Sequence, residues 1–566
     1  MSLISSIQLA SNALRAADIG IQVVGQNISN ANTPGYIREE VVFSAAPTQR
    51  RGNILLGLGV QVDAVVQKVD RFLVNRLRAA TSDRLNGDTQ EQTYLELERL
   101  VGELSDTDLS TSMTSFFNSI NEVLNQPASL SIRNLAALQG KTLADDIRRL
   151  ADRVTDVRID LNNRIKQVGD DINRLTEAIR DLNVQIAQVE GGDSTQSDAV
   201  GLRDQRFVAL SELASLIGIR VDEQPSGSVT ISINGTFLVA DGVRREVKVV
   251  QESIGGLVLA DIRLADTDQT LSNNSGALSG LVTSRDTILG GFLQDLDNFA
   301  QTLIFEFNKV FTSGQGLSGY QSITGEFAVD DVSADLDAAG LAFTPINGSF
   351  QVQVRDKQTG LTQTTDVFID LNGLDNNDTT LTSLAAKLTA IDGITATVTP
   401  QRQLSITADS SEQEFAFAAD TSGVLAALGM NTFFVGTTAR TIAVNQAVVT
   451  DAGKFSASRS GIGADSDNAV ELAGFLDRSL ETNNNESISI LYNRLVGNMT
   501  QAASASRAVA EGFRIFEDTL NGQHLAISGV SLDEETIRLM AFQQAFQAAA
   551  RYISTLSELM DVLVNL

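Results

Sequence analysis

Apolar residues near the start of the chain recur with the spacing of a coiled coil. They lie alternately four and three residues apart over almost four heptads: Leu3, Ile7, Ala10, Leu14, Ala17, Ile21, Val24 and Ile28. This a/d pattern predicts a helix whose apolar stripe packs against another helix. Because so short a helix is marginal alone in water, it needs a partner.

The end of the chain carries a second stripe of the same kind. Its positions are Leu539, Phe542, Phe546, Ala549, Ile553, Leu556, Met560 and Leu563. The simplest interpretation is that the two terminal helices pair as a coiled coil, with the rest of the chain inserted between them. An ordinary intramolecular bundle is the alternative. Several of these positions are alanine, which packs closely but buries little area, so we expect a weak pair in the isolated chain.

Between the two ends, helical and strand patterns alternate in blocks. One apolar stripe from Leu143 to Val189 predicts a long helix that ends at Gly191-Gly192. Other helical patterns cover about 85–125, 198–217, 280–311, 466–481 and 486–520. Alternating residues predict strands near 218–263 and 325–435, the second block also containing a short helix, and we expect 436–465 to be extended chain or loop.

This order of blocks predicts a multidomain α+β protein. It is a nested rod with terminal coiled-coil helices, a long-helix bundle domain and two mainly β outer modules. The expected domains are an axial core of 1–60 plus 522–566, a helical bundle of 61–217 plus 276–324 plus 436–521, a small β domain of 218–275, and an outer α+β module of 325–435.

The charge and composition of the chain exclude some classes of binding partner. The 566 residues have a formal net charge of −28 and include no cysteine. A chain with this much negative charge repels phosphate backbones and anionic lipid. We therefore expect no nucleic-acid partner. No apolar run approaches the roughly 18–20 residues of a membrane span, so we expect no membrane insertion. The first residues lack the basic region of a Sec signal, so any export is expected to use another route.

The residues offer little for catalysis. The single histidine is His524, and the paired carboxylates are adjacent in sequence, so on a helix they do not face each other. The stretch DLNGLDNND at 370–378 lacks the sixth-position glycine and twelfth-position glutamate of an EF-hand loop. We therefore expect no enzymatic activity, no catalytic residue, no metal and no cofactor.

Two short motifs lie where the terminal stripes border the middle of the chain: one at the end of the N-terminal stripe and one at the start of the C-terminal stripe. The first follows the N-terminal helix and consists of Asn27, Asn30, Asn32, Thr33, Pro34, Gly35 and Tyr36. The second begins the C-terminal helix and includes Gly529, Val530, Leu532, Asp533, Glu534, Glu535, Gln543 and Gln544. In the first motif, Pro34 disfavours helix at Thr33 and Gly35 permits a turn, so the motif should end the first helix.

These two motifs, in this order, resemble the signatures of bacterial flagellar rod, hook and hook-associated proteins. The GV-LDEE form of the second motif and residues 276–311 are most similar to the hook-associated protein 1 family of hook–filament junction proteins. The resemblance implies an extracellular structural protein of the flagellum. Its subunits would form a ring or helical assembly by coiled-coil packing of the terminal helices.

The resemblance also implies partners and a route. The partners would be other copies of the chain, the hook protein, the second junction protein and an export chaperone, and the chain would leave the cell unfolded through the flagellar type III system. Two alternatives stay open. One is another flagellar axial protein, either the hook protein or the second junction protein. The other is a surface adhesin that acts through the outer module, 325–435.

Overall fold

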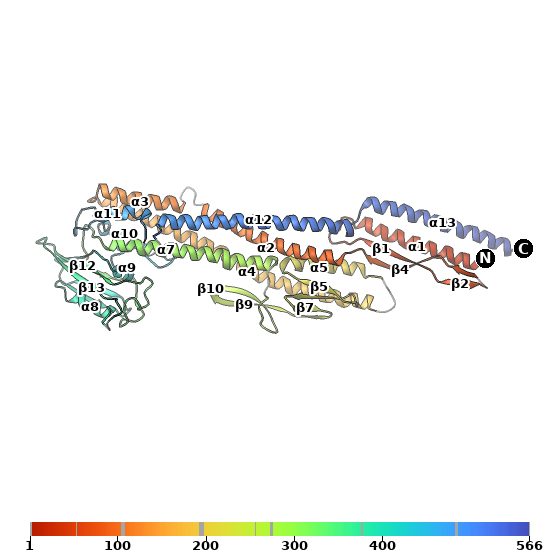
Figure 1. The fold of residues 1–566 in the computed structure, drawn as a ribbon, viewed down its shortest axis with the longest axis horizontal. Coiled ribbons are helices and arrows are strands. Elements are labelled where there is room, and N and C mark those ends of the chain that lie inside the picture. Colours follow the sequence, from red (N-terminus) through yellow and green to blue (C-terminus); the bar gives the residue numbers. More distant parts are fainter. Residues whose placement is uncertain are drawn as a thin grey trace. The chain divides into compact units, whose positions relative to one another are not determined.

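The computed structural model combines long helices with several small sheets, so the predicted multidomain α+β class is confirmed (Figure 1). It describes residues 3–51, 54–102, 108–191, 197–254, 256–271, 275–374, 377–480 and 485–564. The chain divides into two compact units. Unit 1 comprises Met1–Gln92, Ile159–Arg285 and Ser504–Leu566, and unit 2 comprises Thr93–Arg158 and Asp286–Ala503. The finer division into four domains stays a prediction.

The helices largely follow the apolar stripes of the sequence. They are α1 Leu3–Ser29, α2 Arg71–Gly102, α3 Leu109–Asn125, α4 Leu130–Glu190, α5 Val200–Leu216, α6 Gly276–Thr283, α7 Leu289–Thr312, α8 Leu381–Thr389, α9 Val424–Leu428, α10 Gln446–Thr450, α11 Asp467–Ala473, α12 Ile488–Ser528 and α13 Leu532–Val564, with single turns η1 Ser284–Ile288, η2 Ala452–Lys454 and η3 Gly474–Asp477. The long helix predicted from Leu143 is α4, which begins earlier because Ala136 and Ala137 extend its buried face.

The strands form small antiparallel sheets. Their bounds are β1 Glu39–Ala45, β2 Thr48–Arg51, β3 Ile54–Gly57, β4 Val60–Gln67, β5 Arg220–Glu223, β6 Val229–Ile233, β7 Thr236–Ala240, β8 Val243–Arg244, β9 Val247–Ile254, β10 Leu257–Leu264, β11 Ser322–Thr324, β12 Gly348–Asp356, β13 Thr362–Ile369, β14 Ile394–Val398, β15 Leu404–Ala408, β16 Gln413–Ala418, β17 Phe434–Val435 and β18 Ala443–Val444. The sheet orders are β1-β4, β2-β3, β5-β6-β7-β8, β9-β10, β11-β15-β14, β13-β12-β16 and β17-β18.

The strands β1 to β4 were not among the sequence predictions. β1 pairs with β4, and their register shifts between Val42 and Phe43. The alternation along these strands is weak because β1 is buried only at Glu39 and β4 only at Ala64, and their other residues are partly buried or exposed. A period-2 pattern is clear only where one face of a strand is buried and the other is not.

In unit 1, three asparagines on α4 bind the backbone of the neighbouring strands. Asn162 donates to the Val258 carbonyl at 3.0 Å and accepts from the Ala260 N–H at 2.7 Å. Asn173 bonds in the same way to both backbone groups of Val247, at 2.7 and 2.9 Å.

Asn183 makes the same kind of contact with β6. It bonds to both backbone groups of Val229, at 2.8 and 3.0 Å. An asparagine amide carries one acceptor and a donor group side by side, so it can replace a peptide group as partner of a strand. The side chains of α4 therefore position β6, β9 and β10 along the helix.

Unit 2 is held by two apolar cores. The first gathers buried phenylalanines from α3, α7 and later segments, with neighbouring ring centroids about 5–6 Å apart: Phe116, Phe117, Phe307, Phe311, Phe433, Phe434, Phe455 and Phe475. The second lies between Tyr320 and Met430 and joins the strands β12 to β16 to α8. Residues 436–465, expected as extended chain or loop, include α10 and bury Phe455 completely.

Among the described residues, none of the helices combines the length and the apolar character that a membrane span requires.

Replacing Asn162 by alanine should destabilise unit 1, whereas the same change at its neighbour Asn163 should not. The Asn162→Ala variant leaves two strand backbone groups without their partner and removes an acceptor of Arg285, 2.9 Å away. We expect the free energy of unfolding to fall by about 2–3 kcal/mol. Asn163 is exposed, so Asn163→Ala should cost less than about 0.5 kcal/mol. Urea unfolding measures both, and equal effects would contradict the role of Asn162.

Candidate functional site

The two terminal helices, α1 and α13, lie side by side in unit 1 (Figure 1). At Gly20 of α1, an added Cβ would stand 2.8 Å from the ring of Phe542 on α13. The same ring lies 6.1 Å, centroid to centroid, from Phe43 on β1. Phe542 therefore packs on both α1 and β1, and only a residue without a side chain at position 20 gives it room.

The positions of the two predicted stripes differ in burial. Five are buried, namely Ala10, Ala17, Val24, Ala549 and Leu556. Nine are half-buried, namely Leu3, Ile7, Leu14, Ile21, Ile28, Leu539, Phe542, Phe546 and Ile553. Met560 is 37% exposed, and the side chain of Leu563 lies outside the described residues.

The buried face of α1 is wider than the predicted stripe. It also includes Ser5, Ser6, Ala16, Gly20 and Val23. The reason is that β1 and β4 pack on the same helix beside α13. The proposed axial role of the stripe residues stays a prediction.

The N-terminal motif forms a compact turn after α1, which ends at Ser29 as the motif predicts. The Asn30 amide donates to the Gln26 carbonyl at 3.1 Å, and the Thr33 hydroxyl donates to Asn30 at 3.2 Å. Gly35 has a φ of +79°, and an added Cβ would stand 2.3 Å from Val208 on α5. Both its backbone conformation and this contact require glycine. Asn32 and Pro34 are exposed.

Asn27 connects the N-terminal motif to the C-terminal one. Its side-chain oxygen accepts from the Tyr36 hydroxyl at 2.8 Å and from the Glu39 N–H at 2.9 Å. Its amide donates to the Glu39 carbonyl at 3.0 Å and to the Glu535 carboxylate at 3.1 Å. Asn27 is 1% exposed and Glu535 is not exposed at all, so the two motifs meet away from water.

A buried ion pair lies at the same place. The Arg38 Nε donates to the Glu535 carboxylate at 2.8 Å, and the Arg38 Nη2 lies within ion-pair distance of Glu535, at 2.6 Å, and of Glu534, at 2.9 Å. The backbone N–H of Arg38 donates to the Ser528 carbonyl at 3.0 Å, at the end of α12. Because Arg38 is 4% exposed, its charge depends on these carboxylates, and removal of one would leave a buried charge partly unpaired.

Sequence reasoning identified Asn27, Glu534 and Glu535 but missed Arg38 and Glu39. The available signal was Arg38 itself, an arginine two residues after the motif in the stretch that leads into a strand. A single positive charge beside a terminal motif could have been matched with the acidic run at 533–535. Nothing in the sequence, however, shows that the two are buried together.

The other C-terminal motif residues form the start of α13. Gly529 and Val530 link α12 to α13, and the Gly529 N–H donates to the Leu525 carbonyl at 2.9 Å. Leu532 is the first residue of α13, and Asp533, Glu534 and Glu535 lie in its first turn, where the helix dipole favours negative charge. Gln543 and Gln544 are exposed.

Two further carboxyl groups lie close to this contact and are costly to ionise. Burial, together with the charge of Asp204, raises the pKa of Glu39 to about 7. Burial likewise raises the pKa of Asp204 to about 6, although the Ile37 N–H and the Gln67 amide donate to it. Burial also raises the pKa of the Tyr36 hydroxyl.

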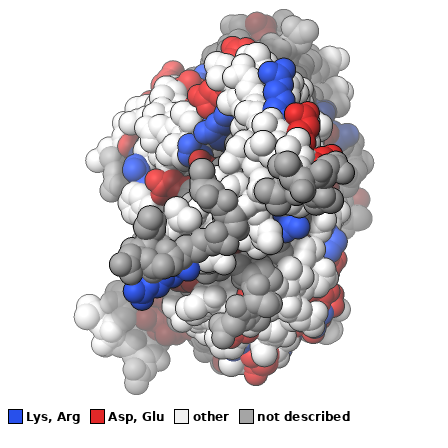
Figure 2. Space-filling view, turned by 90° about the vertical axis from the view of Figure 1, so that its right-hand side faces the viewer, with Lys and Arg blue, Asp and Glu red and all other residues white. Residues whose placement is uncertain are grey.

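The outer face of α13 carries exposed apolar side chains. The exposed fractions are 64% for Ile537, 50% for Met540, 40% for Tyr552, 53% for Leu559 and 59% for Val562. Figure 2, seen from the right-hand side of Figure 1, shows a mostly uncharged described surface on which charges of both signs are scattered. An extended apolar row of this kind marks a surface that contacts another protein.

The chemistry of this region is that of a structural contact. A buried ion pair and hydrogen-bonded amides join the two ends of the chain. Among the described residues no group of three or more histidine, cysteine, aspartate or glutamate side chains is arranged to hold a metal ion.

Three family models match parts of the chain. The model described as "Flagellar hook-associated protein FlgK helical domain" covers residues 94–327. The model "Flagellar basal body rod FlgEFG protein C-terminal" covers 521–566, and "Flagella basal body rod protein" covers 7–36. The region 521–566 contains all of α13, and the region 7–36 contains most of α1, so each terminal helix matches a flagellar model separately.

Curated relatives match along almost the whole chain. Flagellar hook-associated protein 1 of Escherichia coli (strain K12) is 26% identical, with 99% of this chain and 100% of that protein aligned. Its counterpart in Bacillus subtilis (strain 168) is 25% identical, with 99% and 97% aligned. A solved structure, that of the flagellar hook junction protein FlgK from Burkholderia pseudomallei, has a similar fold, with a TM-score of 0.51, 16% identity, and 80% of this chain and 100% of that chain covered.

Neutralising Glu535 should destabilise unit 1 far more than neutralising its neighbour. In Glu535→Gln the buried Arg38 keeps only Glu534, whose side chain is 60% exposed. We expect a loss of about 3 kcal/mol in the free energy of unfolding, the lower end of the cost of breaking a buried pair. The matched control Glu534→Gln should lose less than about 1 kcal/mol. Urea unfolding followed by circular dichroism would contradict the buried pair if both variants behaved alike.

Replacing Glu39 by glutamine should change the pH dependence of stability. The folded-state pKa of Glu39 is about 7, raised from 4.5, so its favourable contribution is complete below pH 4.5 and is lost as pH rises through 7. Relative to the parent, Glu39→Gln should therefore gain up to about 3 kcal/mol at pH 8 and little at pH 4.5. Unfolding curves of both proteins from pH 4.5 to 8 provide the test.

The companion variant Asp204→Asn should also gain stability relative to the parent as pH rises. The gain should appear at lower pH than in Glu39→Gln, because the folded-state pKa of Asp204 is about 6. Parallel pH profiles for parent and variants would show that neither carboxyl group is costly to ionise in the folded state.

Proposed function

Because the chain belongs to the flagellar hook-associated protein 1 family, we propose that it is a structural component of the bacterial flagellum at the junction between hook and filament. Proteins of this family are structural parts of the flagellum. The observation that carries the proposal is the buried hydrogen bond from the Asn27 amide on α1 to the Glu535 carboxylate on α13, which joins the two regions that match flagellar rod models, 7–36 and 521–566.

The junction would be a ring of subunits in which the terminal helices pack by coiled-coil contacts. α1 and α13 already pack together in one chain. The apolar row on α13, from Ile537 to Val562, stays exposed there. In the assembly this row would contact the terminal helices of neighbouring copies, which removes its apolar surface from water.

The weak contact between α1 and α13 supports export of an unfolded chain. The residues of α1 that are buried are mostly small, and among the residues of α13 whose burial is described, only Glu535, Ala549 and Leu556 are buried. Such a contact has a low local free energy of opening. The terminal segments would therefore remain open during export through the flagellar type III system, with a chaperone covering their apolar residues.

The partners in the finished structure would be other copies, the hook protein on one side and the second junction protein on the other. The relatives favour this assignment over the alternatives of a hook protein or second junction protein. The relatives from Escherichia coli and Bacillus subtilis are both named flagellar hook-associated protein 1, and both align over nearly their full lengths. The location that follows is the flagellum outside the cell.

Charged substitutions on the exposed row of α13 should prevent assembly without unfolding the chain. The test variant is Ile537→Asp with Leu559→Asp, at positions 64% and 53% exposed. The circular dichroism spectrum of the purified variant should match that of the parent, since neither side chain is buried in the single chain. In a strain that lacks the native gene, the variant should restore less than about a tenth of parental swimming, because like charges would be buried at each contact.

The matched control is Gln547→Asp with Ser554→Asp, which adds the same charge at exposed polar positions of α13. It should restore swimming. Immunoblots of the culture medium separate export from assembly: a variant that is exported but not assembled accumulates outside the cell. Normal swimming and normal filaments in the Ile537→Asp, Leu559→Asp strain would contradict assembly through this face.

A further inference from the structure

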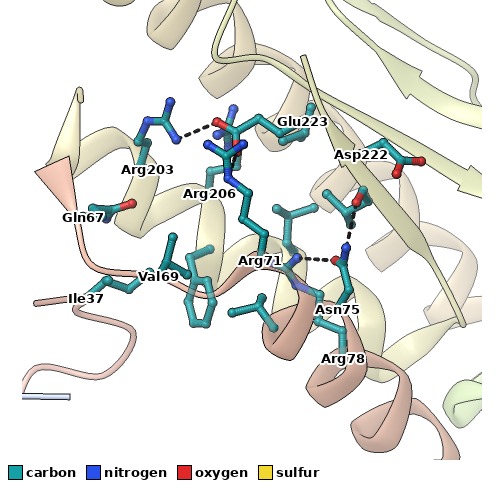
Figure 3. Close-up of a pocket in the computed structure, with 15 residues that line it drawn as sticks. Ile37, Gln67, Val69, Arg71, Asn75, Arg78, Arg203, Arg206, Asp222 and Glu223 are labelled. Carbon is teal, nitrogen blue, oxygen red and sulfur yellow. Dashed lines mark hydrogen bonds and ion pairs between the residues drawn. The ribbon is translucent and has the colours of Figure 1, made fainter. Parts of the chain in front are cut away.

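A pocket of about 260 Å³ lies in unit 1 between α2, α5 and β5 (Figure 3). Its volume is far more than the roughly 10–15 Å³ that a single water molecule needs. Four arginines line it, namely Arg71, Arg78, Arg203 and Arg206. So many guanidinium groups around one cavity raise the question of which negative charges balance them.

Two of the four arginines are balanced by carboxylates. Arg203 pairs with Glu190 and with Glu223, each at 2.7 Å. Arg71 pairs with Glu223 at 2.9 Å from a side chain that is 65% exposed. Figure 3 shows Arg71 and Arg203 directed toward Glu223 at one side of the pocket. The other acidic residue of the lining, Asp222, has its own partner in Arg220, 3.1 Å away.

Arg206 has no carboxylate within ion-pair distance among the described residues. It is 4% exposed and donates to the Asn183 side chain at 3.0 Å and to the Gly227 carbonyl at 2.6 Å. Both acceptors are neutral. Burial and the neighbouring Arg203 lower the pKa of Arg206 to about 10, as expected for a charge that is removed from water without full compensation.

Arg78 is less well satisfied still. It is 8% exposed, and its one hydrogen bond in the described part of the chain is to the Asn75 oxygen at 3.3 Å. Its Nε has no partner. The guanidinium carbon lies 5.4 Å from the centre of the Phe207 ring, which accounts for its packing but not for its donors. Burial, followed by the charge of Arg206, lowers the pKa of Arg78 to about 10.

Two buried guanidinium groups that lack a carboxylate therefore face one cavity. A buried cation without an anion is strongly unfavourable, and a planar guanidinium matches the oxygens of a phosphate or carboxylate group through paired hydrogen bonds. Entry is open beside Arg71, whose side chain is 65% exposed. The cavity thus has the charge, the donors and the access that a small anion requires.

We propose that this pocket binds a small oxyanion of the phosphate type, held by Arg78 and Arg206. The anion neutralises the two charges and accepts hydrogen bonds from the two guanidinium groups. It joins α2 to α5 at the base of the segment that carries the N-terminal motif. The inference is independent of the assembly proposed above, because none of the residues that line the pocket belongs to α1 or α13.

The test is calorimetric titration of the full-length protein with sodium phosphate, at an ionic strength held constant with sodium chloride. The parent should bind with saturation at one site. In Arg78→Met the dissociation constant should rise at least about tenfold, because charge-assisted hydrogen bonds to the anion are lost. The matched control is Arg76→Met, which removes the same charge from an exposed position of α2. It should bind phosphate as the parent does.

Two results would overturn the proposal. One is the absence of saturable phosphate binding by the parent, which requires no variant. The other is equal affinity in the parent and in a folded Arg78→Met protein. Should Arg78→Met fail to fold, Arg78→Lys decides the matter, since it keeps the charge but loses the paired donors: weaker binding supports the site, and unchanged affinity contradicts it.

Discussion

The arrangement of unit 1 depends on one buried ion pair that joins residues near opposite ends of the chain. Arg38 and Glu535 are separated by 497 positions, and Glu535 is fully buried. Bringing such distant residues together costs conformational entropy, and taking both charges out of water costs more. The pair is therefore favourable only if neighbouring polar groups also stabilise it. Asn27 donates to Glu535, Glu534 adds a second carboxylate beside Arg38, and the Ser528 carbonyl accepts from the Arg38 backbone N–H, so the end of α1, the start of β1 and the first turn of α13 must form together.

Beyond this pair, the contact between the terminal helices is made largely by small side chains. Gly20 admits the ring of Phe542, and Ala10, Ala17 and Ala549 allow the backbones to approach. Small residues bring helices close but remove little apolar area from water. The large apolar side chains of α13 are therefore left on its outer face, where they are available to other molecules. One helix thus serves a weak contact within the chain and a larger one outside it.

The sequence predicted the helices well because their apolar stripes are long and regular. The pairing of α1 with α13 followed from two matching heptad patterns. The strands β1 to β4 were missed because few of their side chains are fully buried. Arg38 and Glu39 were missed for a different reason: arginine and glutamate side chains are usually solvated, and these two are buried by contacts with other segments of the fold. Burial of this kind arises from residues far apart in sequence, which a local pattern does not contain.

The asparagines of α4 have a consequence for how this family can vary in length. Asn162, Asn173 and Asn183 each hold a strand. An α-helix turns by roughly 100° and rises about 1.5 Å per residue. Removing a single residue of α4 between two of them would therefore swing the next amide away from its strand. Insertions and deletions should accordingly be excluded from this stretch of helix and occur in the turns between the strands. The length of α4 between its asparagines therefore determines the spacing of the small sheets.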